Sequence, residues 1–354
     1  MKKINLRGNE RILVVRTDRI GDVILSLPTL ELIKKNYPNC HLAMLVSPYT
    51  QSLLENNPYV DEVIVDDKKS RFGGISGLYR LAKFLRKKGF DVSILLHPSW
   101  RLACLLYLAE IRYRVGTAYR LYSFFFNSRV FQHRKTIEKH EIEYNLDMLL
   151  PLGISAEKTL PKVYLLPDEE EKGRALLKEF GIGLDDLVVV IHPGSGDSSL
   201  NFPARKFGGL ADMLVEKERA IVVLTGKREE SDLANTVAKN MKTNPINLVG
   251  KLELRGLASV LRRADLMISN STGPMHLATS LGTPVVAIFC PIKVAGPGRW
   301  GPYGGNHQVI LPPVPLCRKC DTERCRYYNC MDRIDTQEVY LKAKSILSSR
   351  KGFE

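Results

Sequence analysis

The chain has 354 residues, a length that suits two domains better than one. Hydrophobic residues make up 44% and charged residues 25%, as in an ordinary globular protein, and no apolar run approaches the roughly 18 residues of a membrane-spanning helix. The first ten residues are polar and charged, unlike a secretory signal, so we expect a cytoplasmic protein.

The formal net charge is +14, and most of the excess lies in the first half. Residues 1–165 hold 26 basic and 16 acidic side chains, a net charge of +10, against +4 for the remainder. A basic surface attracts phosphate groups on lipids, nucleic acids or phosphorylated substrates alike. Because no nucleic-acid recognition motif is present, we expect no nucleic acid among the partners.

Short apolar strands alternate with helical segments along the first half. We expect strands at residues 12–15, 41–46, 60–65 and 91–96, and helices at residues 23–35, 50–56 and 78–88. Pro28 lies inside the first helical segment and must kink or restart it.

The same alternation restarts in the second half. We expect strands at residues 187–191, 220–224, 247–249, 266–269 and 285–289, and helices at residues 257–264 and 275–281. Alternating strands and helices imply crossover connections and parallel sheets. We therefore predict an α/β fold with two Rossmann-like domains, residues 1–165 and 166–335. A C-terminal helix at residues 336–354 is expected to follow and, as one option, to return to the first domain.

Ligands of open parallel sheets bind at the carboxyl ends of the strands, where helix N-termini present N–H groups. Three strand ends in the second half are rich in glycine and hydroxyl groups, at residues 193–196, 225–226 and 269–276. The strand end in the first half carries Asp22 instead. This division predicts that the second domain holds a diphosphate and that the first supplies a reacting side chain.

Each of these features also has a plain structural explanation. Asp22 could be a helix cap, and His276 a buried structural histidine. Two nucleotide-binding classes are disfavoured. The chain lacks the Gly-x-x-x-x-Gly-Lys-Ser/Thr pattern of P-loop enzymes, and Gly194 and Gly196 lack the third glycine of the dinucleotide fingerprint.

Three motifs occur along the chain in a characteristic order. They are residues 16–23 (RTDRIGDV) with Leu27 and Pro28, residues 192–196 (HPGSG) with Phe202 and Pro203, and residues 269–278 (SNSTGPMHLA) with 282–284 (GTP). In order and spacing they resemble the motifs of the lipopolysaccharide heptosyltransferases, glycosyltransferase family 9. The resemblance covers nearly the whole chain.

The resemblance implies a GT-B architecture, in which two Rossmann-like domains face each other across a cleft. It also implies an inverting, metal-independent transfer of heptose from ADP-heptose to a lipid A–core acceptor, with no cofactor required for catalysis. Asp22 is then the base that takes the proton from the acceptor hydroxyl. The partners are a nucleotide sugar, a lipid-linked saccharide and, peripherally, the cytoplasmic face of the inner membrane.

The resemblance further implies which residues bind each substrate. The donor-binding residues are Gly194, Ser195, Gly226, Glu229, Glu230, Leu252, Ser271, Thr272, Gly273 and His276. The acceptor-binding residues are Arg16, Thr17, Arg19 and Arg120. Backbone N–H groups at Thr272 and Gly273, with His276, would stabilise the leaving diphosphate. Glu229 or Glu230 would bind the ribose, and Leu252 would line the adenine pocket.

Two positions depart from the family pattern. Leu200 precedes Asn201, Phe202 and Pro203 in a segment where family members commonly have lysine, and Ser271 stands where well-known members have aspartate. Either a neighbouring cation (Arg205, Lys206 or Lys227) compensates, or the transferred sugar differs.

Four of the seven cysteines, Cys317, Cys320, Cys325 and Cys330, lie within fourteen residues. Their spacing suits zinc or an iron–sulfur cluster, so we expect a structural zinc as one option. The alternative is a metal-free loop that is reduced or partly disulfide-linked. The other cysteines, Cys40, Cys104 and Cys290, lie in or beside apolar runs and suit a core.

A segment rich in aromatics, residues 119–126, is followed by Arg129, His133, Arg134, Lys135, Lys139 and His140. It suits contact with an anionic bilayer or, equally, a core element with a solvated basic flank. Three other functions remain open: a transferase for a different nucleotide sugar, a non-catalytic relative that binds nucleotide sugars, and a zinc-stabilised nucleic-acid-binding protein.

Overall fold

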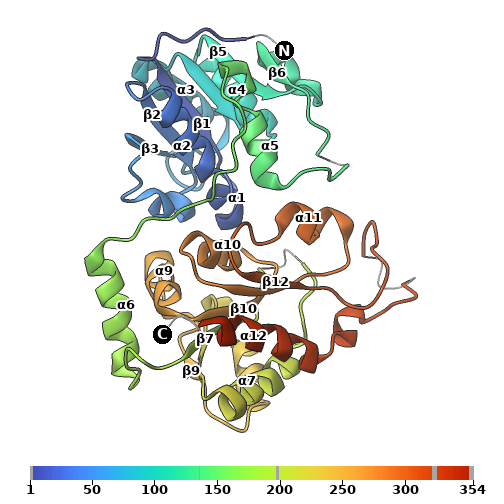
Figure 1. Ribbon diagram of the computed structural model, residues 1–354. Coiled ribbons are helices and arrows are strands. Elements are labelled where there is room, and N and C mark those ends of the chain that lie inside the picture. Colours follow the sequence, from blue (N-terminus) through green and yellow to red (C-terminus); the bar gives the residue numbers. More distant parts are fainter. Residues whose placement is uncertain (1–2, 135, 197–198, 321–324, 351–354) are drawn as a thin grey trace. The chain divides into compact units, whose positions relative to one another are not determined.

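The computed structural model describes residues 3–134, 136–196, 199–320 and 325–350. The chain divides into two compact units, residues 1–164 and residues 165–354 (Figure 1). This division lies one residue before the predicted domain boundary.

The first unit is built on a six-stranded parallel sheet in the order β3-β2-β1-β4-β5-β6. The strands are β1 (Arg11–Val15), β2 (His41–Val46), β3 (Glu62–Val65), β4 (Val92–Leu95), β5 (Tyr113–Thr117) and β6 (Ser128–Val130). The helices are α1 (Ile20–Ile24), α2 (Leu27–Asn36), α3 (Gly74–Lys88), α4 (Trp100–Leu108) and α5 (Glu141–Asp147), with short 3-10 turns η1 (Pro48–Leu54), η2 (Leu121–Phe125) and η3 (Leu150–Leu152).

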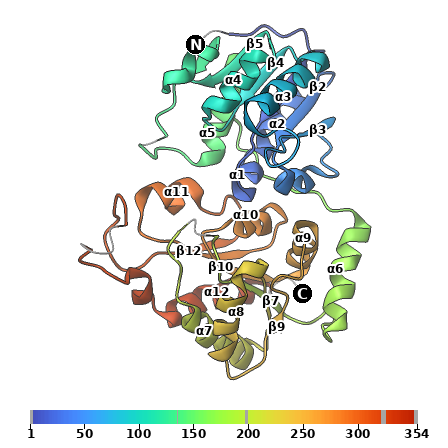
Figure 2. The ribbon, with the colours of Figure 1, turned by 180° about the vertical axis from the view of Figure 1, so that it is seen from behind.

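Helices cover both faces of this sheet, α3 and α4 on one side and α2 and α5 on the other (Figures 1 and 2). Leu13 and Val15 of β1 pack in one core cluster with residues of α3 and α4. Because both faces are covered, the central strands are apolar throughout, which is why their apolar runs predict them well.

The predicted helix at residues 23–35 is divided in the structure. α1 ends at Ile24, and α2 begins at Leu27 with Pro28 in its first turn. Proline is tolerated there because the first N–H groups of a helix have no partner within the helix. The expected helix at residues 50–56 is a 3-10 turn, η1.

The second unit has its own six-stranded parallel sheet, in the order β12-β11-β10-β7-β8-β9. The strands are β7 (Val188–His192), β8 (Ile221–Leu224), β9 (Ile246–Asn247), β10 (Leu266–Asn270), β11 (Val285–Ile288) and β12 (His307–Ile310). The helices are α6 (Pro167–Glu179), α7 (Ala204–Glu218), α8 (Ser231–Lys239), α9 (Leu254–Arg263), α10 (Gly273–Ser280), α11 (Pro297–Trp300) and α12 (Thr336–Arg350), with turns η4 (Arg228–Glu230), η5 (Lys293–Ala295) and η6 (Cys330–Arg333).

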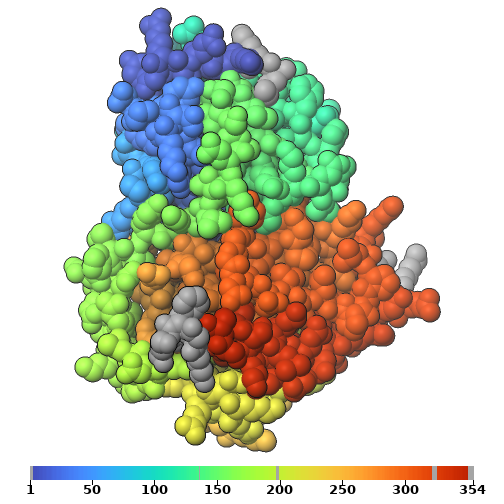
Figure 3. Space-filling model, viewed as in Figure 1, coloured from blue at the N-terminus to red at the C-terminus, as the bar shows by residue number. Residues whose placement is uncertain are grey.

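The C-terminal helix α12 packs in the second unit, against α7 and the strands β10, β11 and β12. Its apolar residues Val339, Ala343 and Ile346 lie in the core cluster of that unit, and its outer face lies on the surface (Figure 3). The expected return of this helix to the first domain is therefore wrong for residues 336–350. The physical reason is that its apolar face is buried against α7 and the sheet.

None of the helices in the described part of the chain is both long and apolar enough to cross a membrane.

Candidate active site

Asp22 lies in the first turn of α1, just after the carboxyl end of β1. Its side chain is 16% exposed, and its Oδ1 accepts a hydrogen bond from Nη2 of Arg16, the residue that directly follows the strand. The end of a buried strand thus positions the guanidinium of Arg16, and a short helix positions the carboxylate of Asp22 next to it. Asp22 is accessible enough to meet a substrate and is held in one orientation.

Arg16 is 2% exposed and serves several acceptors besides Asp22. Its Nε donates to Asp18 at 2.8 Å, and its Nη1 donates to Glu141 and to Asn145, each at 3.2 Å. Four of the five guanidinium N–H groups are therefore engaged within the protein. Arg16 therefore positions the carboxylates around it, and acceptor binding by Arg16 itself stays a prediction.

The supporting residues come from distant parts of the first unit. Glu141 is completely buried and also accepts a hydrogen bond from Arg134 at 2.6 Å. Asn145, one turn later on α5, donates at 3.0 Å to the carbonyl of Leu25, where α1 gives way to α2. Hydrogen bonds of Glu141 and Asn145 thus hold α5 against α1 and Arg16. No local sequence pattern indicates these contacts.

Burial raises the pKa of the Asp22 carboxyl above its ordinary value. Arg16 opposes this rise, while the negative charges of Asp18 and Glu141 add to it. Burial also acts on Asp18, but there Arg16 and His97, at 3.0 Å from Oδ2, outweigh it and lower the pKa. A carboxylate with a raised pKa is the better base, so the environment favours Asp22 over Asp18.

The other acceptor-binding candidates lie at the surface of the same sheet edge. Arg19 is exposed and precedes α1, Thr17 is half-buried, and Arg120 is exposed after β5. β5 lies two strands from β1, and the carboxyl ends of parallel strands share one edge. Arg120 and Arg19 can therefore be tested as ligands of one acceptor.

The three predicted donor turns are neighbours in the second unit. β10, β7 and β8 are adjacent, so the turns that follow Asn270, His192 and Leu224 lie side by side. Asn270 ties them together: it is buried, its Nδ2 donates to the carbonyl of Pro193 at 2.6 Å, and its Oδ1 accepts from the N–H of Phe202 at 2.8 Å. The motif containing Asn270 was recognised in the sequence, but this linking role was not.

Glu230 fills the space between two of the turns. Its carboxylate accepts from the backbone N–H of Gly196 at 3.3 Å and of Lys227 at 2.9 Å. A Cβ at position 194 would lie 1.9 Å from Oε1 of Glu230, so glycine is required for this close approach. Gly196 has a φ of +54°, which also favours glycine. Of the two predicted ribose ligands, Glu230 belongs to the turn, whereas Glu229 is exposed.

His192 lies beneath these turns and is held neutral. Its Nδ1 is 3.1 Å from Oγ1 of Thr225, and its Nε2 is 3.9 Å from Glu230. Burial lowers the pKa of His192 to about 4, with Glu230 opposing the shift and Lys227 adding to it. At neutral pH it therefore packs the turns together and adds no charge.

α10 begins in the third turn. Thr272 precedes its first residue, Gly273, and His276 is buried one turn inside it. Ser271 donates its N–H to the carbonyl of Ile288, and its own carbonyl accepts from Ser199 at 3.4 Å. The first N–H groups of such a helix are suited to an anion.

The remaining candidates for donor binding, Ser195 and Leu252, differ in how deeply they are buried. Ser195 is buried and donates to the carbonyl of Ser199 at 3.3 Å. Leu252 is half-buried and lies two residues beyond Gly250, whose N–H donates to the carbonyl of Gly226. These contacts place Leu252 near the β8 turn, and its role in lining an adenine pocket stays a prediction.

Two of the three cations expected to compensate for Leu200 are engaged elsewhere. Arg205 pairs with Asp332 at 2.5 Å, and Lys206 donates to the carbonyl of Ile334 at 2.7 Å. Lys227 is exposed, and its backbone N–H donates to Glu230 in the β8 turn, so its role beside a phosphate stays a prediction.

The four clustered cysteines are free thiols. Among the described residues, no three His, Cys, Asp or Glu side chains are close enough together to hold a metal ion.

Two Rossmann-like units, one with a polar carboxylate turn and the other with three glycine- and hydroxyl-rich turns, make up a GT-B fold, which solved heptosyltransferase structures share. The family model of glycosyltransferase family 9 (heptosyltransferase) matches residues 78–330. The chain belongs to this family and is a glycosyltransferase.

Individual relatives agree with this assignment. The chain is 30% identical over 316 residues to a Haemophilus influenzae protein described as a glycosyltransferase, covering 86% of this chain and 90% of that protein. It is 29% identical over 275 residues to lipopolysaccharide heptosyltransferase 3 of Escherichia coli K12, covering 76% and 79%. The crystal structure of a family 9 glycosyl transferase from Veillonella parvula superposes with a TM-score of 0.88 at 27% identity, over 98% of this chain and all of that one.

Proposed function

We propose that the protein transfers a heptose from ADP-heptose to a lipid A–core acceptor, with inversion and without a metal. The observation that carries this proposal is the state of Asp22: a partly exposed carboxylate with a raised pKa, oriented by a buried arginine. Heptosyltransferase relatives from lipopolysaccharide synthesis support the sugar and the acceptor.

The proposed reaction is a single displacement. Asp22 takes the proton from an acceptor hydroxyl, whose oxygen attacks the anomeric carbon of the donor. The bond between that carbon and the diphosphate breaks, and its electron pair leaves with ADP. Because attack comes from the face opposite the leaving group, the anomeric configuration inverts.

Negative charge grows on the diphosphate as it leaves. The N-terminal turn of α10, at Thr272 and Gly273, offers N–H groups to that charge, and Lys227 offers an ammonium. Stabilisation by fixed protein groups of this kind needs no metal ion. We therefore expect transfer to proceed at the same rate with or without added Mg²⁺ or Mn²⁺.

A donor screen tests the proposed substrate. Thermal unfolding of the purified chain is followed with ADP-, UDP-, GDP- and dTDP-sugars. ADP compounds should raise the unfolding temperature most, and incubation of ADP-heptose with a heptose-deficient lipid A–core acceptor should yield a product of inverted configuration. Equal shifts from all four nucleotides would contradict the ADP-heptose assignment.

A second candidate is transfer of a different nucleotide-linked sugar to another surface glycan. Leu200 and Ser271 favour it, because they remove a cation and a carboxylate that family members present to the donor. In the same screen, a larger shift with a non-ADP sugar than with ADP-heptose would select this candidate.

We also propose that the first unit contacts the cytoplasmic face of the inner membrane through exposed apolar side chains. Leu121, Phe124 and Phe131 are 99%, 67% and 66% exposed, and Trp100 on the adjoining α4 is 64% exposed. Phe126 is buried in the core, so the proposed contact leaves this residue of the segment out. Residues 98–137 contain seven basic side chains and one acidic side chain, which favours anionic lipid.

Vesicle co-sedimentation tests this contact. The double variant Leu121→Ser, Phe124→Ser should lose binding to vesicles that contain phosphatidylglycerol. Leu184→Ser, at a 71% exposed leucine of the second unit, is the matched control and should bind like the wild type. Undiminished binding by the double variant would count against the proposed membrane surface.

A further inference from the structure

A loop in the second unit carries four cysteines that the transfer reaction does not use. Cys317 is half-buried, Cys320 is exposed, Cys325 is half-buried and Cys330 is buried. A buried cysteine is readily explained as a small core residue, but an exposed one is not. Packing in the core therefore explains why position 330 is a cysteine. It does not explain the cysteines at positions 320 and 325.

The two outer cysteines are fixed in the scaffold. The N–H of Cys317 donates to the carbonyl of Pro291 at 2.8 Å, and its carbonyl accepts from the N–H of Lys293 at 2.8 Å, which joins it to the chain leaving β11. Cys330 begins η6 and lies in the core cluster of the second unit. Two residues later, Asp332 pairs with Arg205 at the start of α7.

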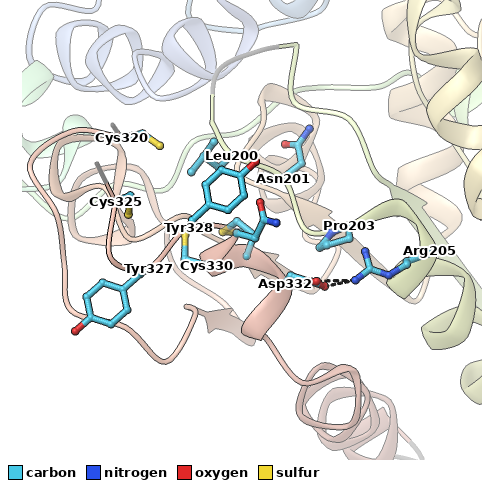
Figure 4. A pocket seen from close by; sticks show the side chains of 12 residues that line it. Leu200, Asn201, Pro203, Arg205, Cys320, Cys325, Tyr327, Tyr328, Cys330 and Asp332 are labelled. Carbon is cyan, nitrogen blue, oxygen red and sulfur yellow. Dashed lines mark hydrogen bonds and ion pairs between the residues drawn. The ribbon is translucent and has the colours of Figure 1, made fainter. Parts of the chain in front are cut away.

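The two inner cysteines lie at one cavity with Cys330. Cys320, Cys325 and Cys330 line this cavity of about 290 Å³, and Leu200 and Asn201 line it as well (Figure 4). The cavity therefore joins the cysteine loop to the segment that follows the β7 donor turn.

The spacing of the four cysteines also favours a shared site. Two residues separate Cys317 from Cys320, four separate Cys320 from Cys325, and four separate Cys325 from Cys330. Short spacings of this kind are typical of cysteines that bind one metal as thiolates.

We propose that Cys317, Cys320, Cys325 and Cys330 together bind one thiolate-preferring metal centre, zinc or iron, that fixes this loop against the 200–203 segment. Four sulfur ligands suit a tetrahedral site for these metals. The thiols have not closed to ligand distances among the described residues, so binding draws Cys320 and Cys325 toward the two anchored cysteines. Each thiol that becomes a ligand releases its proton to solvent.

The centre has a structural consequence for the donor turns. The segment beside the loop is tied to β10, through Ser199 to Ser271 and through Phe202 to Asn270. Holding the loop against Leu200 and Pro203 therefore steadies the backbone that joins two donor turns. This inference goes beyond the proposed transfer and does not depend on which sugar is transferred.

Metal analysis of the full chain tests the proposal. Protein purified under reducing conditions and incubated with equimolar Zn²⁺ or Fe²⁺, then desalted, should retain about one metal centre per chain. Replacement by Co²⁺ should give the intense thiolate-to-cobalt charge-transfer absorption of a tetrahedral sulfur site. Colourless protein with zinc would identify a zinc ion, and iron without inorganic sulfide would identify a single iron. Iron together with inorganic sulfide would identify an iron–sulfur cluster. Each of these three results would support the proposal.

Variants separate this centre from adventitious binding. Cys320→Ser, Cys325→Ser should lose the metal and the cobalt absorption, whereas Cys104→Ser, outside the loop, should keep both. The double variant should also unfold at a lower temperature than the Cys104→Ser control. Retention of the metal by the double variant, or less than about half an equivalent on the wild type, would overturn the proposal. A titration of the thiol groups in the denatured, metal-free chain gives a further test. Three reactive thiols in place of seven would overturn the proposal, because the four clustered cysteines would then be disulfide-linked.

Discussion

Nη2 of Arg16 donates a hydrogen bond to Oδ1 of Asp22, although the two residues lie on opposite sides of the turn that follows β1. The arginine is almost completely buried, and the aspartate is the more exposed partner. The same guanidinium contacts Asp18 and Glu141, so one cation is shared among three carboxylates. This arrangement determines both how Asp22 is oriented and how readily it takes a proton.

Arg16→Met should destabilise the first unit by about 3–5 kcal/mol, because it leaves buried carboxylates without their cation. Arg86→Met is the control. It removes an ion pair with Glu110, also in the first unit, that is 60% exposed on the arginine side, which should cost about 1 kcal/mol or less. Urea unfolding followed by the fluorescence of Trp100, in a Trp300→Phe background, measures the first unit. Equal effects of both substitutions would contradict the role assigned to Arg16.

Asp18→Asn should move the acid limb of the pH profile of kcat/KM to lower pH. The negative charge of Asp18 raises the pKa of Asp22, so its removal lowers that pKa and leaves the base ionised in more acidic solution. Asp147→Asn, which removes a carboxylate paired with Lys139, should leave the limb in place. A shift to higher pH in Asp18→Asn would show that another group controls the limb.

Gly194→Ala should weaken nucleotide binding by about tenfold or more, since the new Cβ displaces the Glu230 carboxylate from its two backbone N–H donors. Gly209→Ala is the matched control, because a Cβ at that position of α7 meets nothing within 4 Å. Titration calorimetry with ADP gives both affinities. Wild-type affinity in Gly194→Ala would contradict the proposed donor turn.

The sequence predicts the central strands and the donor turns because both depend on local patterns. Apolar runs mark strands buried on two faces, such as β1 and β7, and glycine with hydroxyl residues marks the turns that follow. β5 and β6 escape prediction, since residues 113–130 mix arginines and aromatics without a clear period.

The parts of the site that could not be predicted depend on contacts between distant residues. Glu141 and Asn145 reach Arg16 across more than 120 positions of the chain, and both are buried polar residues on one face of α5. In the sequence they look like ordinary helix residues. The burial of Arg16 is likewise not visible in the sequence, which therefore gives no sign that this arginine holds three carboxylates in place.

The most direct measurement compares transfer and ADP binding in Asp22→Asn and in the wild type. Asparagine keeps the shape of the side chain but cannot take the proton, so we expect transfer to fall by about 10²–10⁴-fold. The donor turns belong to the other unit, so ADP affinity should remain that of the wild type. Transfer at the wild-type rate by the folded variant would contradict the assignment of Asp22 as the catalytic base.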